Sequence, residues 1–292
     1  MRDSVDLGRR ALFMVPFGVA PALIAAGRSS PSGSEHDDWP AWAPQRPALY
    51  ARLDALKRSG RDIRTFGATL DGAADDSDAL ERAVSAAAVV LIPGNATLRV
   101  TRQIALKRPV TILGIGNGAT ISVETPQADL FLANATGDDP SVFLKGVRID
   151  GIRFIRPAPL RPHGMVLRAY NLREASITRC SSQRMGLLGL HHTRQRLKLY
   201  DRTKGSIDED PALTAGFSAR PDDLSEDILL YDNQVDGESY MSQIVRFEFA
   251  RRVALVGNMG KFANISWWGG GARRKEGGDI RHLRRVRDVY IT

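Results

Sequence analysis

The feature that most constrains this chain is a short motif that recurs in its second half. Each copy alternates apolar and polar residues and then reaches a corner residue. The copies are VRIDGIRFIR (Val147–Arg156), ASITRC (Ala175–Cys180), LKLYDR (Leu197–Arg202), ILLYDN (Ile228–Asn233) and VALVGN (Val253–Asn258). Their last residues, taken as the corners, are 24, 22, 31 and 25 positions apart. A period in the twenties with short strands in each unit is typical of a solenoid.

Two of these repeats match over a longer span. Val166–Arg168 precedes Cys180 at the same offsets at which Ile244–Arg246 precedes Asn258. Each unit is therefore predicted to contain two strands, whose alternating residues can stack on those of the neighbouring coils. Cys180, the only cysteine, is expected to be a buried corner residue. The 31-residue step is interpreted as a loop of about residues 203–226, which is rich in Asp, Pro, Gly and Ser.

The first 27 residues have the features of a targeting segment. Gly8–Phe13 resembles the twin-arginine export motif, and an apolar stretch with small residues for cleavage follows it. This stretch contains two prolines and is short for a membrane span, although an uncleaved anchor is the alternative. We therefore expect a periplasmic or secreted bacterial protein with no stable membrane span after processing. Residues 28–47 are expected to be a Pro/Ser-rich linker.

The charge of the chain indicates a class of ligand. The formal net charge is +8, and many of the basic residues lie close to the C-terminal end. A basic surface attracts polyanions. Because export is expected, an acidic polysaccharide is favoured over nucleic acid as the partner. A solvated basic face without a ligand is the alternative.

The segment before the repeats carries a resemblance to a known family. In chain order it contains a strand ending in Phe66-Gly67-Ala68, a turn at Asp71-Gly72, a helix start at Asp75–Asp78 and a strand ending in Pro93-Gly94. This order resembles the opening of the pectate-lyase-like superfamily, in the branch shared by rhamnogalacturonases, epimerases and phage tailspikes. The detailed match spans residues 63–125, and the repeats extend it to the chain end. The resemblance implies an all-β fold, a single-stranded right-handed parallel β-helix over residues 48–292.

Both ends of such a solenoid need cover, because an open end exposes apolar surface and unpaired backbone groups. The apolar stripe over residues 75–88 predicts a helix that caps the first coil. Asp71, Asp75 and Asp76 are therefore assigned to turns and helix capping rather than to catalysis. A further helix is predicted over residues 48–58. The chain stops inside a repeat, so we expect either a truncated product without a C-terminal cap or an end that a partner or second copy covers.

In the resembled superfamily the ligand lies on one parallel sheet flanked by loops. The strands expected to form this sheet span residues 163–169, 185–192, 242–249 and 263–269, and His163 opens the first of them. The candidate catalytic residues are His191, His192, Lys261 and Arg246, and the candidate substrate-binding residues are Arg168, Trp267, Trp268 and Arg273. Histidine or lysine can act as a base, arginine binds carboxylates through paired hydrogen bonds, and a tryptophan ring can stack on a sugar. Surface exposure or ordinary packing is the alternative role for each.

The expected function is a lyase or epimerase that acts on a polysaccharide. A hydrolase needs two carboxylates beside the glycosidic bond, and the predicted groove strands contain no Asp-Asp pair. The acidic candidates are Asp201, Asp232, Asp236, Glu238 and Glu248. Lyases of this kind commonly use calcium, so calcium is the one cofactor that the resemblance implies, with no ligands assigned. The alternatives are a glycoside hydrolase of the same fold and a non-catalytic polysaccharide-binding module.

Overall fold

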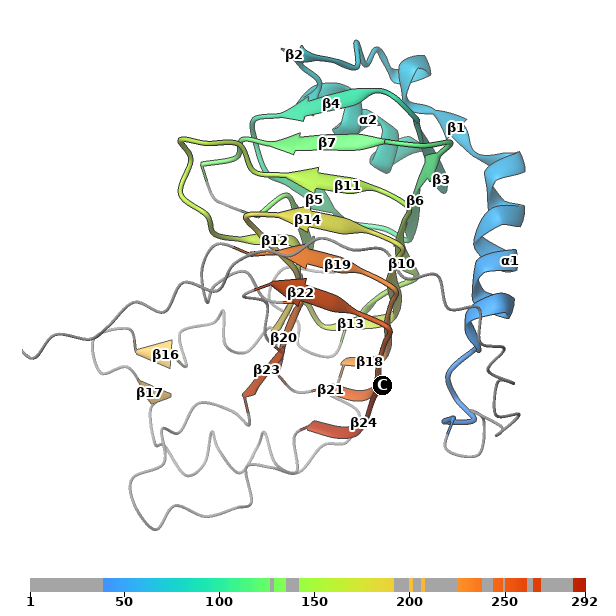
Figure 1. Cartoon of the computed structure of the whole chain (residues 1–292), viewed down its shortest axis with the longest axis vertical. Coiled ribbons are helices and arrows are strands. Elements are labelled where there is room, and N and C mark those ends of the chain that lie inside the picture. The colour runs from blue at the N-terminus through green and yellow to red at the C-terminus, as the bar shows by residue number, and fades with distance from the viewer. Residues whose placement is uncertain are drawn as a thin grey trace, which may run out of the picture. The chain divides into compact units, whose positions relative to one another are not determined.

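The computed structural model of the protein describes residues 39–126, 129–134, 142–191, 200–201, 206–207, 225–237, 244–248, 250–261, 265–268 and 286–292. Over this part of the chain the strands form a single-stranded right-handed parallel β-helix, which confirms the predicted fold. Each full coil adds one strand to each of three parallel sheets, here named A, B and C (Figure 1). The sequence predicted two strands per coil, because the strands of sheet B between residues 153 and 261 are only three residues long, too short to show an alternating pattern.

The strands of each sheet are given in their order along the β-helix. Sheet A contains β1 (Arg61–Asp62), β3 (Val89–Pro93), β6 (Val110–Ile115), β10 (Val147–Asp150), β13 (Leu172–Thr178), β18 (Ser225–Tyr231), β21 (Ala250–Val256) and β24 (Val286–Ile291), and β9 (Leu144–Lys145) pairs separately with β13. Sheet B contains β2 (Asp71–Asp75), β4 (Thr97–Val100), β7 (Thr120–Val123), β11 (Arg153–Ile155), β14 (Ser181–Gln183), β19 (Gln234–Asp236) and β22 (Met259–Lys261). Sheet C contains β5 (Ile104–Leu106), β8 (Phe131–Asn134), β12 (Met165–Tyr170), β15 (Gly186–His191), β20 (Val245–Glu248) and β23 (Ile265–Trp268).

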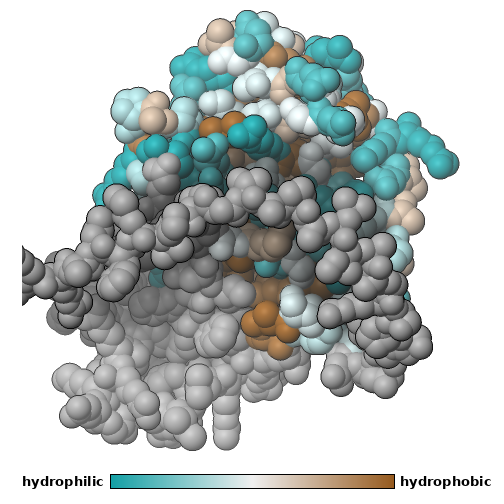
Figure 2. All heavy atoms as spheres, viewed as in Figure 1, coloured by the Kyte–Doolittle hydropathy of each residue, from teal (hydrophilic) through white to brown (hydrophobic). Residues whose placement is uncertain are grey.

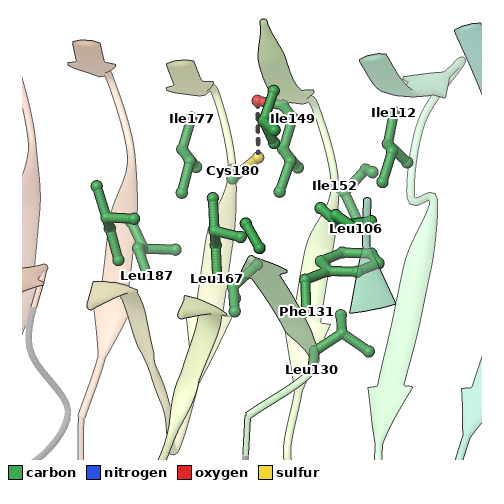
Figure 3. Close-up of a cluster of buried hydrophobic side chains, with 14 of the residues drawn as sticks. Leu106, Ile112, Leu130, Phe131, Ile149, Ile152, Leu167, Ile177, Cys180 and Leu187 are labelled. Atoms are coloured by element: carbon green, nitrogen blue, oxygen red, sulfur yellow. Dashed lines mark hydrogen bonds between the residues drawn. The ribbon is translucent and has the colours of Figure 1, made fainter. Parts of the chain in front are cut away.

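Inward-facing residues of successive coils stack into columns that fill the interior. One column of sheet A consists of Ile112, Ile149, Ile177, Leu230 and Leu255, all of them buried and paired in register. Figure 3 shows Ile112, Ile149 and Ile177 of this column. Burying each of these side chains contributes roughly 1.5–3 kcal/mol. The ILLYDN and VALVGN segments are therefore neighbours in register, as the repeat predicts.

The corner between sheets A and B is held by a ladder of polar side chains. The Oδ1 atom of Asn233 accepts the N–H of Cys180 at 3.0 Å, and its Nδ2 atom donates to the carbonyl of Ile177 at 2.8 Å. Asn258 repeats the arrangement one coil later, accepting from Nδ2 of Asn233 at 2.8 Å and donating to the carbonyl of Leu230 at 2.7 Å. These bonds satisfy backbone groups that the sharp corner leaves unpaired.

The residue before each corner position adopts a left-handed backbone conformation; the corner positions are Ile152, Cys180, Asn233 and Asn258. The φ angle is 69° at Gly151, 49° at Arg179, 53° at Asp232 and 62° at Gly257. At Gly257 a Cβ atom would come within 2.2 Å of Oδ1 of Asp232, so a larger residue there would require that carboxylate to move. Gly151 precedes Ile152, which makes Ile152 the corner that corresponds to Cys180.

Two of the expected repeat positions differ in the structure. Arg156 was predicted to be a corner, but it follows β11, and the corner of that coil is Ile152. The LKLYDR segment was predicted to form a coil, but its described residues Tyr200–Asp201 form β16, which pairs antiparallel with β17 (Ser206–Ile207). Strand β13 pairs directly with β18, and β16 and β17 belong to none of the three parallel sheets. Alternation alone cannot distinguish a coil strand from a strand outside these sheets.

Helix α2 (Ser77–Ala86) caps the first coil, as predicted. Leu80, Ala83 and Val84 are buried in the same apolar cluster as the interior of the β-helix. The acidic residues around this helix serve the backbone. The carboxylate of Asp76 accepts the N–H groups of Thr69 at 2.7 Å and Leu70 at 3.1 Å, and those of Asp75 and Asp71 accept N–H groups two or three residues further along the chain.

Helix α1 (Arg46–Leu56) lies along the outer face of sheet A (Figure 1). Leu49 and Leu53 are buried against Leu91, Leu113 and Val256 in a second apolar cluster. Two short 3-10 turns, η1 (Lys57–Ser59) and η2 (Ile63–Phe66), then lead into the first coil. No helix in the described residues is long and apolar enough to cross a membrane.

Residues 39–45 also pack on sheet A, although the sequence places them in a linker. The ring of Trp39 contacts those of Tyr231 and Tyr290 edge-on, at centroid distances of 5.8 and 5.6 Å. Ala43 is buried in the cluster beneath α1. Apolar residues on the outer face of sheet A need cover, and this segment provides it. The expected signal peptide, residues 1–27, lies outside the described residues.

Candidate functional site

The outer face of sheet C carries the arginines that the repeat places in equivalent positions. Arg168 pairs with Gly189, and Gly189 pairs with Arg246 on the next coil. Ser266 continues the same register position on β23. Neighbouring strands are about 4.8 Å apart, so the two arginine Cα atoms are separated by roughly 10 Å. Gly189 has no side chain to separate the two guanidinium groups.

A second register column runs beside this one. Tyr170 pairs with His191, and Glu248 pairs with Trp268. Because Leu190 pairs with Phe247, His191 and Glu248 occupy corresponding positions on adjacent coils. By backbone register this column therefore consists of Tyr170, His191, Glu248 and Trp268.

The two tryptophans occupy different columns, as strand alternation predicts. Trp267 is in register with Phe247, and through it with the buried residue Leu190. Trp268 is in register with Glu248 and so shares the second column of sheet C. The backbone register therefore assigns Trp268, rather than Trp267, to the column that contains Tyr170.

Arg168 is fixed by a buried carboxylate. Asp129 lies just before β8, and its side chain is only 7% exposed. It accepts the backbone N–H of Met165 at 2.9 Å, hydrogen-bonds Nε of Arg168 and lies 3.2 Å from Nη2 of Arg168. The Arg168 side chain remains 27% exposed. Asp129 thus orients a guanidinium group that still reaches the surface of sheet C.

The loop of residues 156–164, between β11 and β12, borders this face. The buried Arg156 donates from Nε to the carbonyl of Arg161 at 2.8 Å and from Nη1 to that of Thr125 at 3.1 Å. Arg184 donates from Nη2 to the carbonyl of Leu160 at 2.7 Å. The loop is therefore held by two arginines that bind its backbone. The side chain of Arg161 is exposed.

His163 lies in this loop, two residues before β12. Burial lowers the pKa of His163, and the charges of Arg161, Arg168 and Arg156 lower it further, while Asp129 acts in the opposite direction. The pKa of His163 is therefore below its ordinary value of about 6.5, and the imidazole is mostly neutral at pH 7. A neutral imidazole can accept a proton or donate a hydrogen bond.

The structure separates one predicted catalytic residue from the rest. Lys261, a candidate base that lies between Asn258 and Trp267 in the sequence, ends β22 in sheet B, in register with Asp236. Lys261 therefore lies on a different sheet from Arg246 and Trp268, which belong to strands of sheet C. The sequence could not show this, because the three-residue strand β22 has no pattern of its own. His191 ends β15, whereas His192 and Arg273 lie outside the described residues.

The acidic candidates do not assemble into a described catalytic pair. Asp232 hydrogen-bonds Tyr50 and forms an ion pair with Arg46 at 3.0 Å beneath α1, so it has a structural role. Asp236 is exposed on sheet B, Glu248 lies on β20 of sheet C and Asp201 lies on β16. Glu238 is not among the residues that the structure describes.

The described residues offer no metal site. No group of three or more His, Cys, Asp or Glu residues among them is arranged to hold an ion. They therefore do not fit the calcium ion that the resemblance implies. The buried Cys180 is also not a catalytic thiol, because burial raises its pKa to about 12.

Two features of the site were missed by the sequence analysis. Tyr170 follows Arg168 by two positions, and this spacing places both on the same face of a strand. That signal was available. Asp129 is separated from Arg168 by 39 positions and lies in no repeat, so nothing in the sequence links the two.

The outer face of sheet B is also polar. Thr97, Ser122, Ser181, Gln183 and Gln234 lie along it. Figure 2 views the molecule from this side and shows mainly hydrophilic residues among the upper described coils. Sheets B and C thus both present polar outer faces. Registered arginines also occur on sheet A, where Arg173 and Arg251 share a column, but Glu226 lies between them and forms ion pairs with both. On sheet C the position between Arg168 and Arg246 is Gly189.

Comparison with known proteins gives partial matches. No family model matches this sequence. The pre-neck appendage protein of Bacillus phage B103 is 32% identical over 105 residues, which cover 34% of this chain and 12% of the appendage protein. That of Bacillus phage phi29 is 30% identical over 104 residues, with the same two coverages. The matched region thus spans about an eighth of the length of these relatives.

Similar solved structures include two β-helical proteins. The pre-mature phi29 gene product 12 has a TM-score of 0.48 and 16% identity, over 74% of this chain and 31% of that one. An iota-carrageenase complexed to iota-carrageenan fragments has a TM-score of 0.49 and 14% identity, over 79% of this chain and 47% of that one. The fold itself is established by the strand pairing described above, and the comparisons place the chain beside phage appendage proteins in sequence over about one third of its length.

Proposed function

We propose that the protein is a non-catalytic polysaccharide-binding β-helix that holds an acidic polymer along the outer face of sheet C. The observation that carries the proposal is the shared register of Arg168 and Arg246, two coils apart. An acidic polysaccharide presents negative groups at regular intervals, and arginine binds each of them through two parallel hydrogen bonds. Tyr170, in the next column, adds a flat ring that can pack on a sugar.

Several observations favour binding over turnover. Lys261 lies on another sheet, and Asp232 is engaged beneath α1. Asp129, the buried carboxylate of the site, is already hydrogen-bonded to Arg168 and to a backbone N–H. The similar phage proteins are named as appendages. Together these observations support the binding module that the sequence analysis kept as an alternative.

A lyase or epimerase is the second candidate function, and one observation favours it. The neutral imidazole of His163 belongs to the residue two positions before β12, the strand that carries Arg168. A base beside a guanidinium group that neutralises a sugar carboxylate is suited to removing the proton next to that carboxylate. The pair could therefore begin an elimination reaction.

One set of samples separates these functions. The purified protein is incubated with polygalacturonate, alginate and the neutral polymer dextran, and both binding and products are measured. We expect binding to the acidic polymers in calorimetry, with no increase in ultraviolet absorbance and no new reducing ends. An unsaturated, absorbing product would show elimination, and reducing ends without that absorbance would show hydrolysis. Failure to bind any of several acidic polymers would contradict the proposed function.

Export through the twin-arginine route is a proposal of its own. Gly8–Phe13 supports it through its paired arginines and the apolar stretch that follows. A reporter fused to residues 1–47 should reach the periplasm of a bacterium, and R9K/R10K should abolish that export. Equal export of both fusions would contradict the proposal. Association with a partner at the C-terminal end stays a prediction.

A further inference from the structure

We infer that residues 39–56 form a strap that ties together coils that are not neighbours in the β-helix, so that its last coils open only when the strap is released. The strap consists of α1 (Arg46–Leu56) and the segment of residues 39–45 before it. The coils of a solenoid contact only their neighbours, so such a stack can open coil by coil from an end. Strand pairing in sheets A, B and C follows this rule, because each strand pairs only with those of adjacent coils. The inference does not rest on the proposed function.

At one end of the strap, Trp39 bridges two strands of sheet A that do not pair with each other. Its ring contacts Tyr231 of β18 and Tyr290 of β24, at centroid distances of 5.8 and 5.6 Å. Strand β21 lies between these two strands, and its residue in register with Tyr290 is the small, buried Ala254. Trp39 therefore links the coil of β18 directly to β24, across the coil that separates them.

The other end of the strap lies on the first coils. Leu49 and Leu53 of α1 are buried in one apolar cluster with Leu91 of β3 and Leu113 of β6. Figure 1 shows the strap running along the stack from the first strands of sheet A toward β24. Because burial of apolar side chains is favourable, the two leucines hold α1 on coils that are several strands away from Tyr290.

Between these ends, two corner residues bind α1 through their side chains. The hydroxyl of Tyr50 donates a hydrogen bond to Asp232, and Nη1 of Arg46 donates to Oδ1 of Asp232 at 3.0 Å. The guanidinium carbon of Arg179 lies 4.4 Å from the centroid of the Tyr50 ring, and its Nη2 atom lies 3.3 Å from Oδ1 of Asp54. Arg179 follows β13 and Asp232 follows β18, so they anchor α1 to two successive coils.

The backbone at these two corners supports a role in holding α1. Four equivalent positions have a positive φ angle, and they are occupied by Gly151, Arg179, Asp232 and Gly257. This conformation is unfavourable for a residue with a Cβ atom, whereas glycine adopts it freely. Strained residues persist where contacts with their surroundings hold them. The two positions that carry side chains are the two that bind α1, so we attribute these side chains to the strap.

The same backbone feature provides a variant that weakens the strap without straining the corner. D232G removes the acceptor of Tyr50 and Arg46, and it places at this corner the residue type that two other coils already have. Asp227 gives a matched control. Its φ angle is 59° against 53° for Asp232, its side chain is 30% exposed against 31%, and its ion pair is with Arg252 rather than with α1.

Hydrogen–deuterium exchange of the full protein, followed by mass spectrometry of its peptides, measures the opening of each element. We expect D232G to speed exchange about tenfold in both α1 and β24, because the strap loses a hydrogen-bonded carboxylate. Exchange in β6, which is far from β24 in the stack, should stay within about twofold of the parent rate. D227G should leave α1 and β24 within about twofold as well. Y50F removes only the hydroxyl that bonds Asp232, so it should give a smaller change in the same direction.

The exchange of β24 decides the inference. If D232G speeds exchange in α1 but leaves β24 at the parent rate, the strap does not hold the last coils and the inference is overturned. If D232G and D227G give the same exchange in α1, Asp232 does not anchor the strap, and the inference is overturned as well. If D232G does not fold, Y50F is compared with the parent protein by the same two criteria.

A second pair of variants tests the bridge at Trp39. W39A removes the ring that contacts Tyr231 and Tyr290, whereas W42A removes a ring that packs against the same apolar cluster but makes none of the described ring contacts. We expect faster exchange of β24 in W39A than in W42A. Equal exchange of β24 in the two variants would show that Trp39 does not tie the coils together.

Discussion

The carboxylate of Asp129, buried at the edge of sheet C, orients the guanidinium group of Arg168 at the surface through hydrogen bonds to Nε and Nη2. Breaking a buried ion pair on one side leaves an uncompensated charge, which costs 3–5 kcal/mol when both groups are fully buried. Arg168 is partly exposed, so we expect D129A to lower the free energy of unfolding by about 2 kcal/mol. Urea denaturation measures this loss. In R168M/D129A no charge is left, so its stability should exceed that of D129A; equal or lower stability would contradict the account.

The asparagine ladder predicts a graded effect along the corner between sheets A and B. Asn233 is 1% exposed and bonds both Cys180 and Ile177. We expect N233A to destabilise the protein by roughly 2–3 kcal/mol, because it leaves two buried backbone groups unpaired. N258A should cost less, since Asn258 is partly exposed. Thermal denaturation compares the two variants, and a larger loss for N258A would contradict the ladder.

Helix α1 should contribute to stability through its buried side rather than through helix formation alone. Leu53 is fully buried beneath it, whereas Leu56 is only partly buried. L53A should lower the free energy of unfolding by roughly 2–5 kcal/mol through the cavity that it leaves. L56A is the matched control on the same helix and should cost clearly less in the same denaturation experiment. Equal losses would show that α1 does not pack on sheet A as described.

Protonation of Glu226 in acid should lower the free energy of unfolding of the protein. Burial alone would raise the pKa of Glu226, but the hydrogen bond from Arg251 and the charges of Arg251, Arg173 and Arg252 outweigh it, so its pKa lies below the usual value. A carboxylate with a lowered pKa stabilises the fold above its unfolded pKa of about 4.3, and this contribution disappears as pH falls through the folded pKa. Denaturation between about pH 5 and pH 2 should therefore show a steeper loss for the parent protein than for E226Q. Parallel curves would contradict this role.

Cys180 should be inert in the folded protein. Burial raises the pKa of its thiol to about 12, and its Sγ atom lies 3.2 Å from the carbonyl of Thr178 (Figure 3 shows its place in the core). Because only the thiolate reacts readily, a thiol reagent at pH 8 should label the protein only after a denaturant is added. Rapid labelling of the native protein would show that the A–B corner opens.

The sequence predicted the features that repeat in every coil. Arg168 and Arg246 lie at the same distance from the corner residues Cys180 and Asn258, and equal spacing from a fixed corner becomes equal register in stacked coils. The end-capping helix α2 was also predictable, because its apolar stripe has helical period.

The predictions that were wrong and the residues that were missed belong to segments with no repeating sequence pattern. Strand β22 is only three residues long and has no alternating pattern, so the sequence did not show that Lys261 belongs to sheet B. Arg156 ends an apolar run, as true corners do, but only the three-dimensional stacking identifies Ile152 as the corner. Asp129 reaches Arg168 from another coil, and a single sequence has no signal for such a contact. The local sequence pattern thus predicted the β-helix, whereas contacts between residues far apart in the sequence determine how the candidate site on sheet C is arranged.

The most direct test of the central claim compares the affinities of the parent protein, R246A and R153A for polygalacturonate by calorimetry, with equal Tm values as the check on folding. Arg246 lies in the registered column of sheet C, whereas Arg153 is exposed on sheet B. Losing one charge-assisted contact should raise the Kd of R246A about tenfold and leave that of R153A within about twofold of the parent value. If R246A binds as tightly as R153A, sheet C is not the face that holds the polymer.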